Sequence, residues 1–109
     1  MPDTPKIDVT PEQWKIVHRI LLQYIPKCRV WVFGSRATFT AKTYSDLDLV
    51  IWSHEPISWD ILTAIKDDLS DSDLPFRVDV VDGLSMNASF QSVIDKLKDE
   101  GLIVVLDQL

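Results

Sequence analysis

Four short runs of β-branched and aromatic residues recur along the chain, and their spacing restricts the fold more than any other feature. They occupy residues 29–33, 47–52, 77–81 and 102–106. Runs of this length and composition are typical of β-strands. Stretches with a helical spacing of apolar residues lie before the first run and between the later ones. The sequence therefore predicts a sheet combined with helices, not an all-α or all-β fold.

Start and stop signals predict where the helices lie. Thr10 stands before Pro11 and Gln13, a combination typical of a capped helix start, and this helix should end before Pro26. We expect a second helix over residues 58–69 and a third around residues 90–97, stopped by Gly101. The apolar positions that indicate these three helices are Trp14, Val17, Ile20, Leu21 and Tyr24; Trp59, Leu62, Ile65 and Leu69; and Phe90, Val93, Ile94 and Leu97.

The predicted order of elements is α-β-(short α)-β-α-β-α-β. We therefore expect an α/β (α+β) protein with one mixed β-sheet and helices packed against it. The 109 residues suit one hydrophobic core, so residues 1–109 should form a single domain.

Composition argues against several classes of function. Seventeen acidic and eleven basic residues give a net charge of −6, which disfavours binding to nucleic acid or to anionic membranes. Cys28 is the only cysteine, and neither His18 nor His54 has the spacing of a metal-binding pair. The chain has no apolar run of about 20 residues and no signal-peptide pattern, so we expect a cytoplasmic protein.

Two carboxylates stand at the head of the second predicted strand. Asp46 and Asp48 are two positions apart, so they face the same side, while the apolar residues between and after them face the core. Like charges this close repel each other, and a bound divalent cation reverses that cost. Asp79 adds a third acid within another apolar strand. If the two strands are neighbours, three carboxylates converge on a site suited to Mg²⁺.

The segment before these acids suits a phosphate group. Gly34 follows the first predicted strand, where the lack of a side chain allows a sharp turn and a close approach to a ligand. Ser35 then offers a hydroxyl at the start of a short predicted helix, a position that binds anions well. Gly-Ser after a strand is also common in ordinary turns, so its meaning depends on the acids that follow it.

The combined pattern is recognisable. The sequence GSRA at residues 34–37 is followed by SDLDL at residues 45–49, with Asp46 eleven positions after Ser35, and then by Asp79 in an apolar strand. This pattern resembles the DNA polymerase β-like nucleotidyltransferase superfamily. More narrowly, it resembles the minimal nucleotidyltransferase (MNT) antitoxins that are encoded beside HEPN-domain toxins. One departure is Phe39, where many relatives carry glycine.

The resemblance implies a site and a reaction. Gly34 and Ser35 would hold the phosphates of ATP, and Arg36, which matches a basic residue that often follows this pair, would also belong to the nucleotide-binding site. Asp46 and Asp48 would bind two Mg²⁺ ions, with Mn²⁺ as a possible substitute, and Asp79 would complete the site. AMP would pass to a tyrosine of the cognate HEPN toxin, in a hetero-oligomer, by in-line displacement at the α-phosphorus. Asp79 could accept the proton of the attacking hydroxyl or ligate a metal, and the sequence does not separate these roles.

Two other classes of function remain open at this point. A noncatalytic module with the same fold could neutralise its partner by contact alone, although the intact acids favour catalysis. A metal-dependent nuclease also needs clustered acids, but an acidic chain does not suit its substrate. The four tryptophans, at periodic positions, favour core packing or a partner interface over base stacking. They are Trp14, Trp31, Trp52 and Trp59.

Overall fold

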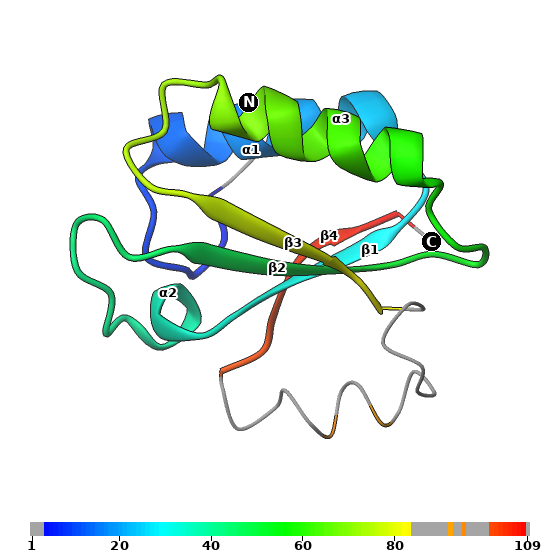
Figure 1. Ribbon diagram of the computed structural model, residues 1–109. Coiled ribbons are helices and arrows are strands. Elements are labelled where there is room, and N and C mark those ends of the chain that lie inside the picture. Colours follow the sequence, from blue (N-terminus) through cyan, green and yellow to red (C-terminus); the bar gives the residue numbers. More distant parts are fainter. Residues whose placement is uncertain (1–3, 84–91, 93–94, 96–100, 109) are drawn as a thin grey trace.

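The computed structural model describes residues 4–83 and 101–108 together with positions 92 and 95, and these residues alternate between helices and strands as predicted (Figure 1). The first two strands, at residues 29–33 and 47–52, have the predicted bounds, whereas the other two, at 78–82 and 103–107, each begin one residue later than expected. Most of the helix predicted around residues 90–97 lies outside the described residues. The elements in chain order are α1 (Pro11–Tyr24), β1 (Arg29–Phe33), α2 (Ser35–Thr38), β2 (Leu47–Trp52), α3 (Trp59–Ser70), β3 (Val78–Asp82) and β4 (Ile103–Asp107).

The strands form one mixed sheet in the order β3-β2-β1-β4. β1 runs antiparallel to both β2 and β4, whereas β2 and β3 run parallel. A parallel pair needs a crossover connection, and α3 provides it. The mixed sheet is confirmed, and the strand that carries Asp79 lies directly beside the strand that carries Asp48.

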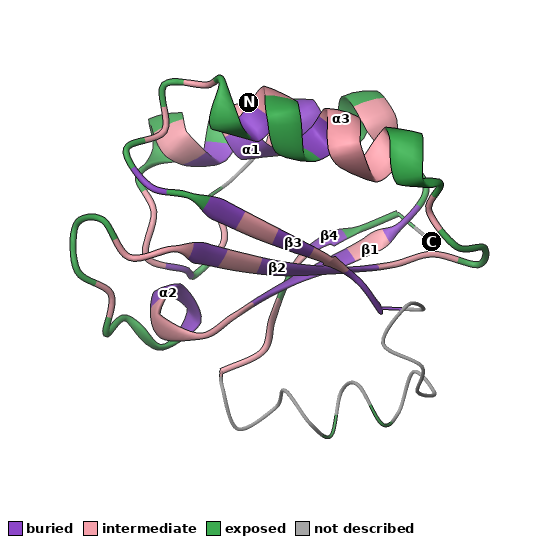
Figure 2. Cartoon of the chain, in the orientation of Figure 1, coloured by how far each residue is buried: buried purple, intermediate pink, exposed green. Residues whose placement is uncertain are grey.

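The hydrophobic core lies between the sheet and the two longer helices. α1 and α3 lie side by side over one face of the sheet (Figure 1). Alternate residues of the three strands β1 to β3 are buried beneath them (Figure 2). These buried strand residues are Val30, Val32, Leu47, Leu49, Ile51, Val78 and Val80. The prediction that the apolar residues of β2 face the core is therefore confirmed.

The start of α1 has the predicted capping box. The Gln13 backbone N–H donates to the Thr10 hydroxyl at 3.1 Å, and the Thr10 backbone N–H donates to the Gln13 side chain at 2.9 Å. At the other end of α1, the Tyr24 hydroxyl donates to the Asp68 carboxylate of α3 at 2.6 Å. The two helices are therefore joined by a polar contact as well as by their shared apolar face.

The interpretation of Trp59 as a member of the apolar stripe of α3 was wrong. Trp59 is 77% exposed, whereas Trp14 is buried beneath the helices and Trp31 is buried beside Val50 on the opposite face of the sheet. Trp59 is the first residue of α3, after the N-cap Ser58. Helical side chains lean toward the N-terminus, so a residue in this position projects past the end of the helix instead of onto the sheet.

Membrane crossing and thiol chemistry can both be compared with the sequence-based expectations. None of the helices in the described part of the chain has the length and apolar character needed to cross a bilayer. The buried Cys28 thiol donates to the Ile25 carbonyl at 3.0 Å, and burial raises its pKa to about 11. Cys28 is therefore a neutral packing residue at physiological pH.

Phe39 adopts a left-handed backbone conformation, with a φ of 59°. It is the C-cap of α2, at the position where glycine is expected from the family resemblance. A side chain in this region strains the backbone by roughly 1–2 kcal/mol. The ring is 61% exposed, so packing returns little of that cost.

Replacing Phe39 by Gly should raise the free energy of unfolding by about 0.5–1 kcal/mol, because the strain relieved exceeds the added freedom of the unfolded chain. Urea unfolding measures this change. The matched control is Phe39→Ala, which removes the ring but keeps the Cβ atom and the strain. Equal stabilisation by both variants would show that the exposed ring, and not the backbone, is responsible.

Candidate active site

Asp48 lies at the centre of a row of side chains that crosses three strands. It pairs with Phe33 of β1 and with Asp79 of β3. Paired residues on neighbouring strands project to the same face. Asp48 and Asp79 therefore share the face of the sheet that α1 and α3 leave uncovered. The three-acid site requires that the strands carrying Asp48 and Asp79 be neighbours. This condition is met.

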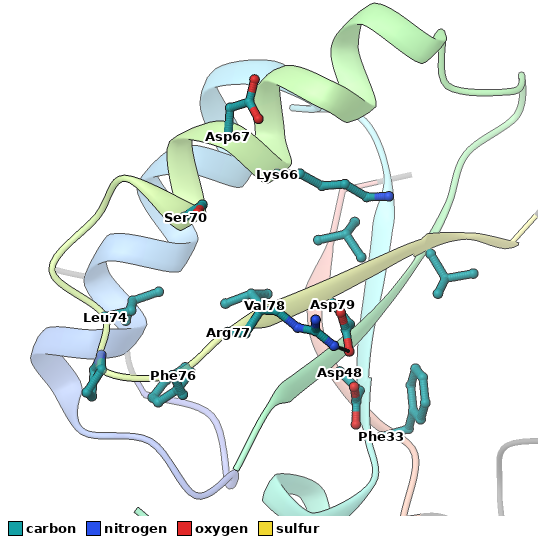
Figure 3. Close-up of a pocket in the computed structure, with 13 residues that line it drawn as sticks. Phe33, Asp48, Lys66, Asp67, Ser70, Leu74, Phe76, Arg77, Val78 and Asp79 are labelled. Carbon is teal, nitrogen blue, oxygen red and sulfur yellow. Dashed lines mark hydrogen bonds and ion pairs between the residues drawn. The ribbon is translucent and has the colours of Figure 1, made fainter. Parts of the chain in front are cut away.

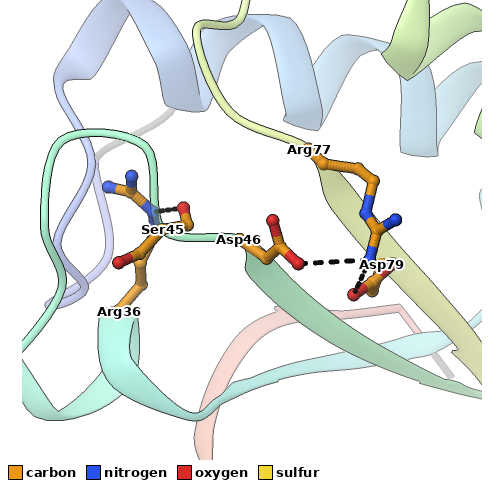
Figure 4. Close-up of polar contacts among 5 residues, drawn as sticks. All are labelled: Arg36, Ser45, Asp46, Arg77 and Asp79. Carbon is orange, nitrogen blue, oxygen red and sulfur yellow. Dashed lines mark hydrogen bonds and ion pairs between the residues drawn. The ribbon is translucent and has the colours of Figure 1, made fainter.

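Asp46 stands one residue before β2, and Arg77 stands one residue before β3. The Leu47 backbone N–H donates to the Arg77 carbonyl at 2.9 Å, which holds the starts of the two strands together. The Arg77 Nη2 atom lies 3.3 Å from Oδ2 of Asp46 and 3.3 Å from Oδ2 of Asp79 (Figure 4). The carboxylates of Asp79 and Asp46 raise the pKa of Arg77.

Sequence reasoning missed Arg77. The available signal was its position, two residues before the third acid and therefore on the same face of β3. A basic residue at that spacing lies within reach of the carboxylates, but the sequence alone does not show that it contacts Asp46, which is 31 positions away.

The carboxylates are not gathered around a metal position in this arrangement. Within the described part of the chain, no three acidic, histidine or cysteine side chains stand close enough together to hold a metal ion. Asp46 and Asp79 are held instead by the Arg77 guanidinium. Their chemistry nevertheless fits a hard divalent cation, because carboxylate oxygens are the ligands that Mg²⁺ prefers. Both side chains are partly exposed, so an ion can reach them.

Gly34 brings the predicted phosphate loop against Asp48. Its φ angle is 82°, and a Cβ atom at this position would lie only 2.8 Å from Oδ2 of Asp48. Only glycine combines this backbone conformation with so close an approach. Ser35 follows as the first residue of α2. The two halves of the sequence motif therefore meet in space.

Arg36 has contacts different from those expected of a nucleotide ligand. Its side chain is buried, and the guanidinium carbon lies 3.9 Å from the centre of the Phe76 ring. Its hydrogen bonds hold the loop that leads to Asp46. The guanidinium donates to the backbone carbonyls of Asp8, Ser45, Thr43 and Lys42 at 2.6, 3.0, 3.1 and 3.4 Å.

A cavity of about 830 Å³ adjoins the acids along β3, at the edge of the described sheet (Figure 3). Asp48 and Asp79 line one side, and Lys66 and Ser70 of α3 line another. The phosphate loop takes no part in this lining. Asp48 therefore adjoins both Gly34 and the cavity.

Comparison with known families shows which family this chain belongs to. The family model described as "Polymerase beta, Nucleotidyltransferase" matches residues 17–108. The chain belongs to the polymerase β nucleotidyltransferase family. A relative from Haemophilus influenzae, the probable protein adenylyltransferase MntA, is 42% identical over 92 residues, which are 84% of this chain and 81% of the relative. The resemblance to minimal nucleotidyltransferases is confirmed.

Solved structures share the fold of this family member. One is a crystal structure of a toxin–antitoxin with AMP-PNP, and another is a mutant of the toxin–antitoxin MntA–HpeT. Each has a TM-score of 0.63 and 21% sequence identity. The matches cover 85% and 86% of this chain and 72% of each of those chains. The polymerase β-like fold is therefore confirmed.

Changing Arg36 to Lys should lower the free energy of unfolding by about 3 kcal/mol, because an ammonium group cannot reach the carbonyls of both Asp8 and Ser45. Urea unfolding measures the loss. The control is Arg19→Lys on the exposed side of α1, which should change stability by less than about 0.5 kcal/mol. Similar small changes in both variants would contradict the bracing role of Arg36.

Proposed function

We propose that this protein is a metal-dependent adenylyltransferase that moves AMP from ATP to a hydroxyl group of a partner toxin, and so acts as an antitoxin. The observation that carries the proposal is the meeting of Gly34 with Asp48, beside Asp79, in a member of a nucleotidyltransferase family. The name of the Haemophilus influenzae relative, probable protein adenylyltransferase, supports transfer to a protein. AMP-PNP in one structural neighbour supports ATP as the nucleotide.

In this proposal Gly34 and Ser35 bind the phosphates. Without a Cβ atom, Gly34 lets a phosphate oxygen approach the backbone. Ser35 contributes its hydroxyl and a backbone N–H from the start of α2, where N–H groups have no acceptor within the helix. Because Gly34 touches Asp48, phosphates held by the loop lie next to the acids. Replacing either residue therefore affects the position of the phosphates relative to the acids.

Asp46, Asp48 and Asp79 would hold Mg²⁺, in the form of two ions, with Mn²⁺ as a substitute. The bound metal supplies positive charge to the phosphate oxygens and makes the attacking hydroxyl more acidic. The chain's own part is to position the carboxylate oxygens of the three acids on one face of two adjacent strands. The register between β2 and β3 fixes their relative positions.

In the transfer itself, the acceptor oxygen bonds to the α-phosphorus while the bond from that phosphorus to the bridging oxygen breaks. Pyrophosphate leaves with the electron pair of the broken bond. Asp79 lines the cavity together with Asp48, so an acceptor that enters the cavity meets its carboxylate. Its carboxylate either takes the proton of the acceptor hydroxyl or fixes a metal beside it.

We propose that the acceptor is a tyrosine of a HEPN-type toxin that forms a hetero-oligomer with this chain. Two observations support this assignment. The structural neighbours are toxin–antitoxins, and one of them carries a tyrosine-to-alanine mutation. The cavity is lined by Asp48 and Asp79 but not by Gly34 or Ser35, so it offers a protein side chain a way to the acids apart from the phosphate loop.

The change Asp79→Asn should separate binding from chemistry. The variant should fold and still copurify with the toxin, because the substitution is nearly isosteric and Asp79 is not part of the core. Transfer of AMP should fall by about 100-fold or more, because the lost carboxylate acts chiefly in the transition state. Intact-mass spectrometry of the toxin, after incubation with ATP and Mg²⁺, detects the adenylyl adduct.

The matched control is Asp73→Asn, which removes the same charge from an exposed residue and should leave transfer unchanged. The thermal midpoint of each variant checks that it is folded. If the wild type leaves no adduct and neutralises the toxin as well as Asp79→Asn does, the protein is a contact-only module and the enzymatic proposal is wrong.

A further inference from the structure

A positively charged side chain of the protein itself lies between two of its acidic site residues. The Arg77 Nη2 atom is equidistant, at 3.3 Å, from the carboxylates of Asp46 and Asp79. These two acids come from different strands, so the guanidinium joins the beginning of β2 to β3 (Figure 4). The proposed metal ligands are therefore already neutralised in part by an internal cation.

The electrostatic reason for this contact is direct. Asp46, Asp48 and Asp79 carry like charges on one face of two adjacent strands, and without a cation they repel each other. Arg77 is placed to relieve this repulsion because it lies two residues before Asp79 on the same strand face and beside Asp46 through the strand pairing. The contact thus follows from the backbone register.

The contact is also weakly held. The Arg77 side chain is 73% exposed, in contrast to the buried Arg36. Exposed ion pairs contribute little to stability, since water screens them and the long side chain loses freedom in forming them. A divalent cation has twice the charge and is compact enough to touch several carboxylate oxygens at once. It can therefore displace the guanidinium without disturbing the core.

We infer that Arg77 is a built-in counter-cation that competes with the divalent metal for Asp46 and Asp79. This inference rests on the proposed function, because it assumes that these acids bind the metal. In the metal-free protein Arg77 holds the acidic ends of β2 and β3 together. Metal loading displaces it, so Arg77 sets the metal concentration at which the site fills. It is a positioning residue and does not act on the reacting atoms.

Mn²⁺ binding without nucleotide tests the inference. The electron paramagnetic resonance signal of free Mn²⁺ gives the Kd for each purified, chelator-treated variant. Arg77→Gln should bind Mn²⁺ roughly tenfold more tightly than the wild type, because it loses both the competing guanidinium and its repulsion of the dication. Arg77→Lys keeps a competing charge and should stay within about threefold of the wild type.

The matched control for net charge is Arg29→Gln. Arg29 pairs with Asp107 at 2.9 Å, at the other end of β1 from Phe33. This variant should bind Mn²⁺ with the wild-type Kd. The double change Asp46→Asn and Asp48→Asn should abolish the binding, which locates the ion at the acids. Thermal midpoints in chelator and in Mn²⁺ give a second readout, and Mn²⁺ should raise the midpoint most in Arg77→Gln.

The inference is overturned if Arg77→Gln binds Mn²⁺ no more tightly than the wild type. It is also overturned if the Kd for Mn²⁺ falls as much in Arg29→Gln as in Arg77→Gln. Failure of Mn²⁺ to bind any variant overturns it as well. AMP transfer to the toxin distinguishes these failures from failure of the proposed function. If transfer occurs and requires metal while the affinity of Arg77→Gln matches that of the wild type, only the role of Arg77 is wrong.

Discussion

The parallel register between β2 and β3 is the constraint on which the candidate site depends. It sets Asp48 directly beside Asp79, and Leu47 beside Val78. Because strand side chains alternate between faces, a slip of one residue would turn Asp79 toward the core and a valine toward the acids. Burial of Leu47, Leu49 and Val80 beneath the helices makes that slip costly. The hydrophobic core therefore fixes the position of the charges.

Two arginines support the site in opposite ways, and burial decides which role each has. Arg36 is buried and donates to backbone carbonyls, which suits a permanent brace for the loop before Asp46. Arg77 is exposed and contacts the carboxylates of Asp46 and Asp79. A buried, fully bonded guanidinium is expensive to move, whereas an exposed ion pair exchanges readily with ions from solution. The structure thus combines a loop held by a buried arginine with an exposed ion pair at the acids.

Much of the site could be predicted from local sequence patterns. The period-2 alternation around Asp48 predicted the strand, its buried face and the shared direction of the acids. The glycine at position 34 and the capping residues before α1 also have local causes, namely backbone conformation and unsatisfied N–H groups. Each of these features depends on residues within a few positions of each other.

The features that sequence reasoning missed depend on contacts between distant segments. The family resemblance assigns Arg36 to the nucleotide-binding site, but its observed contacts are with Asp8, the loop after α2 and Phe76. Arg77 contacts Asp46 only through the pairing of two strands. Trp59 fits the helical period, yet it is the first residue of α3 and is exposed. In each case the fold, and not the local pattern, determines the role.

The most direct test of adenylyl transfer uses ATP labelled at one phosphate at a time. The protein and its toxin are incubated with Mg²⁺ and with ATP carrying ³²P at either the α or the γ position. Attack at the α-phosphorus predicts that the toxin becomes labelled from α-labelled ATP only, and that chelation of the metal prevents it. Label from γ-labelled ATP would indicate phosphoryl transfer, and no label from either would indicate neutralisation by contact. Both results would contradict the account.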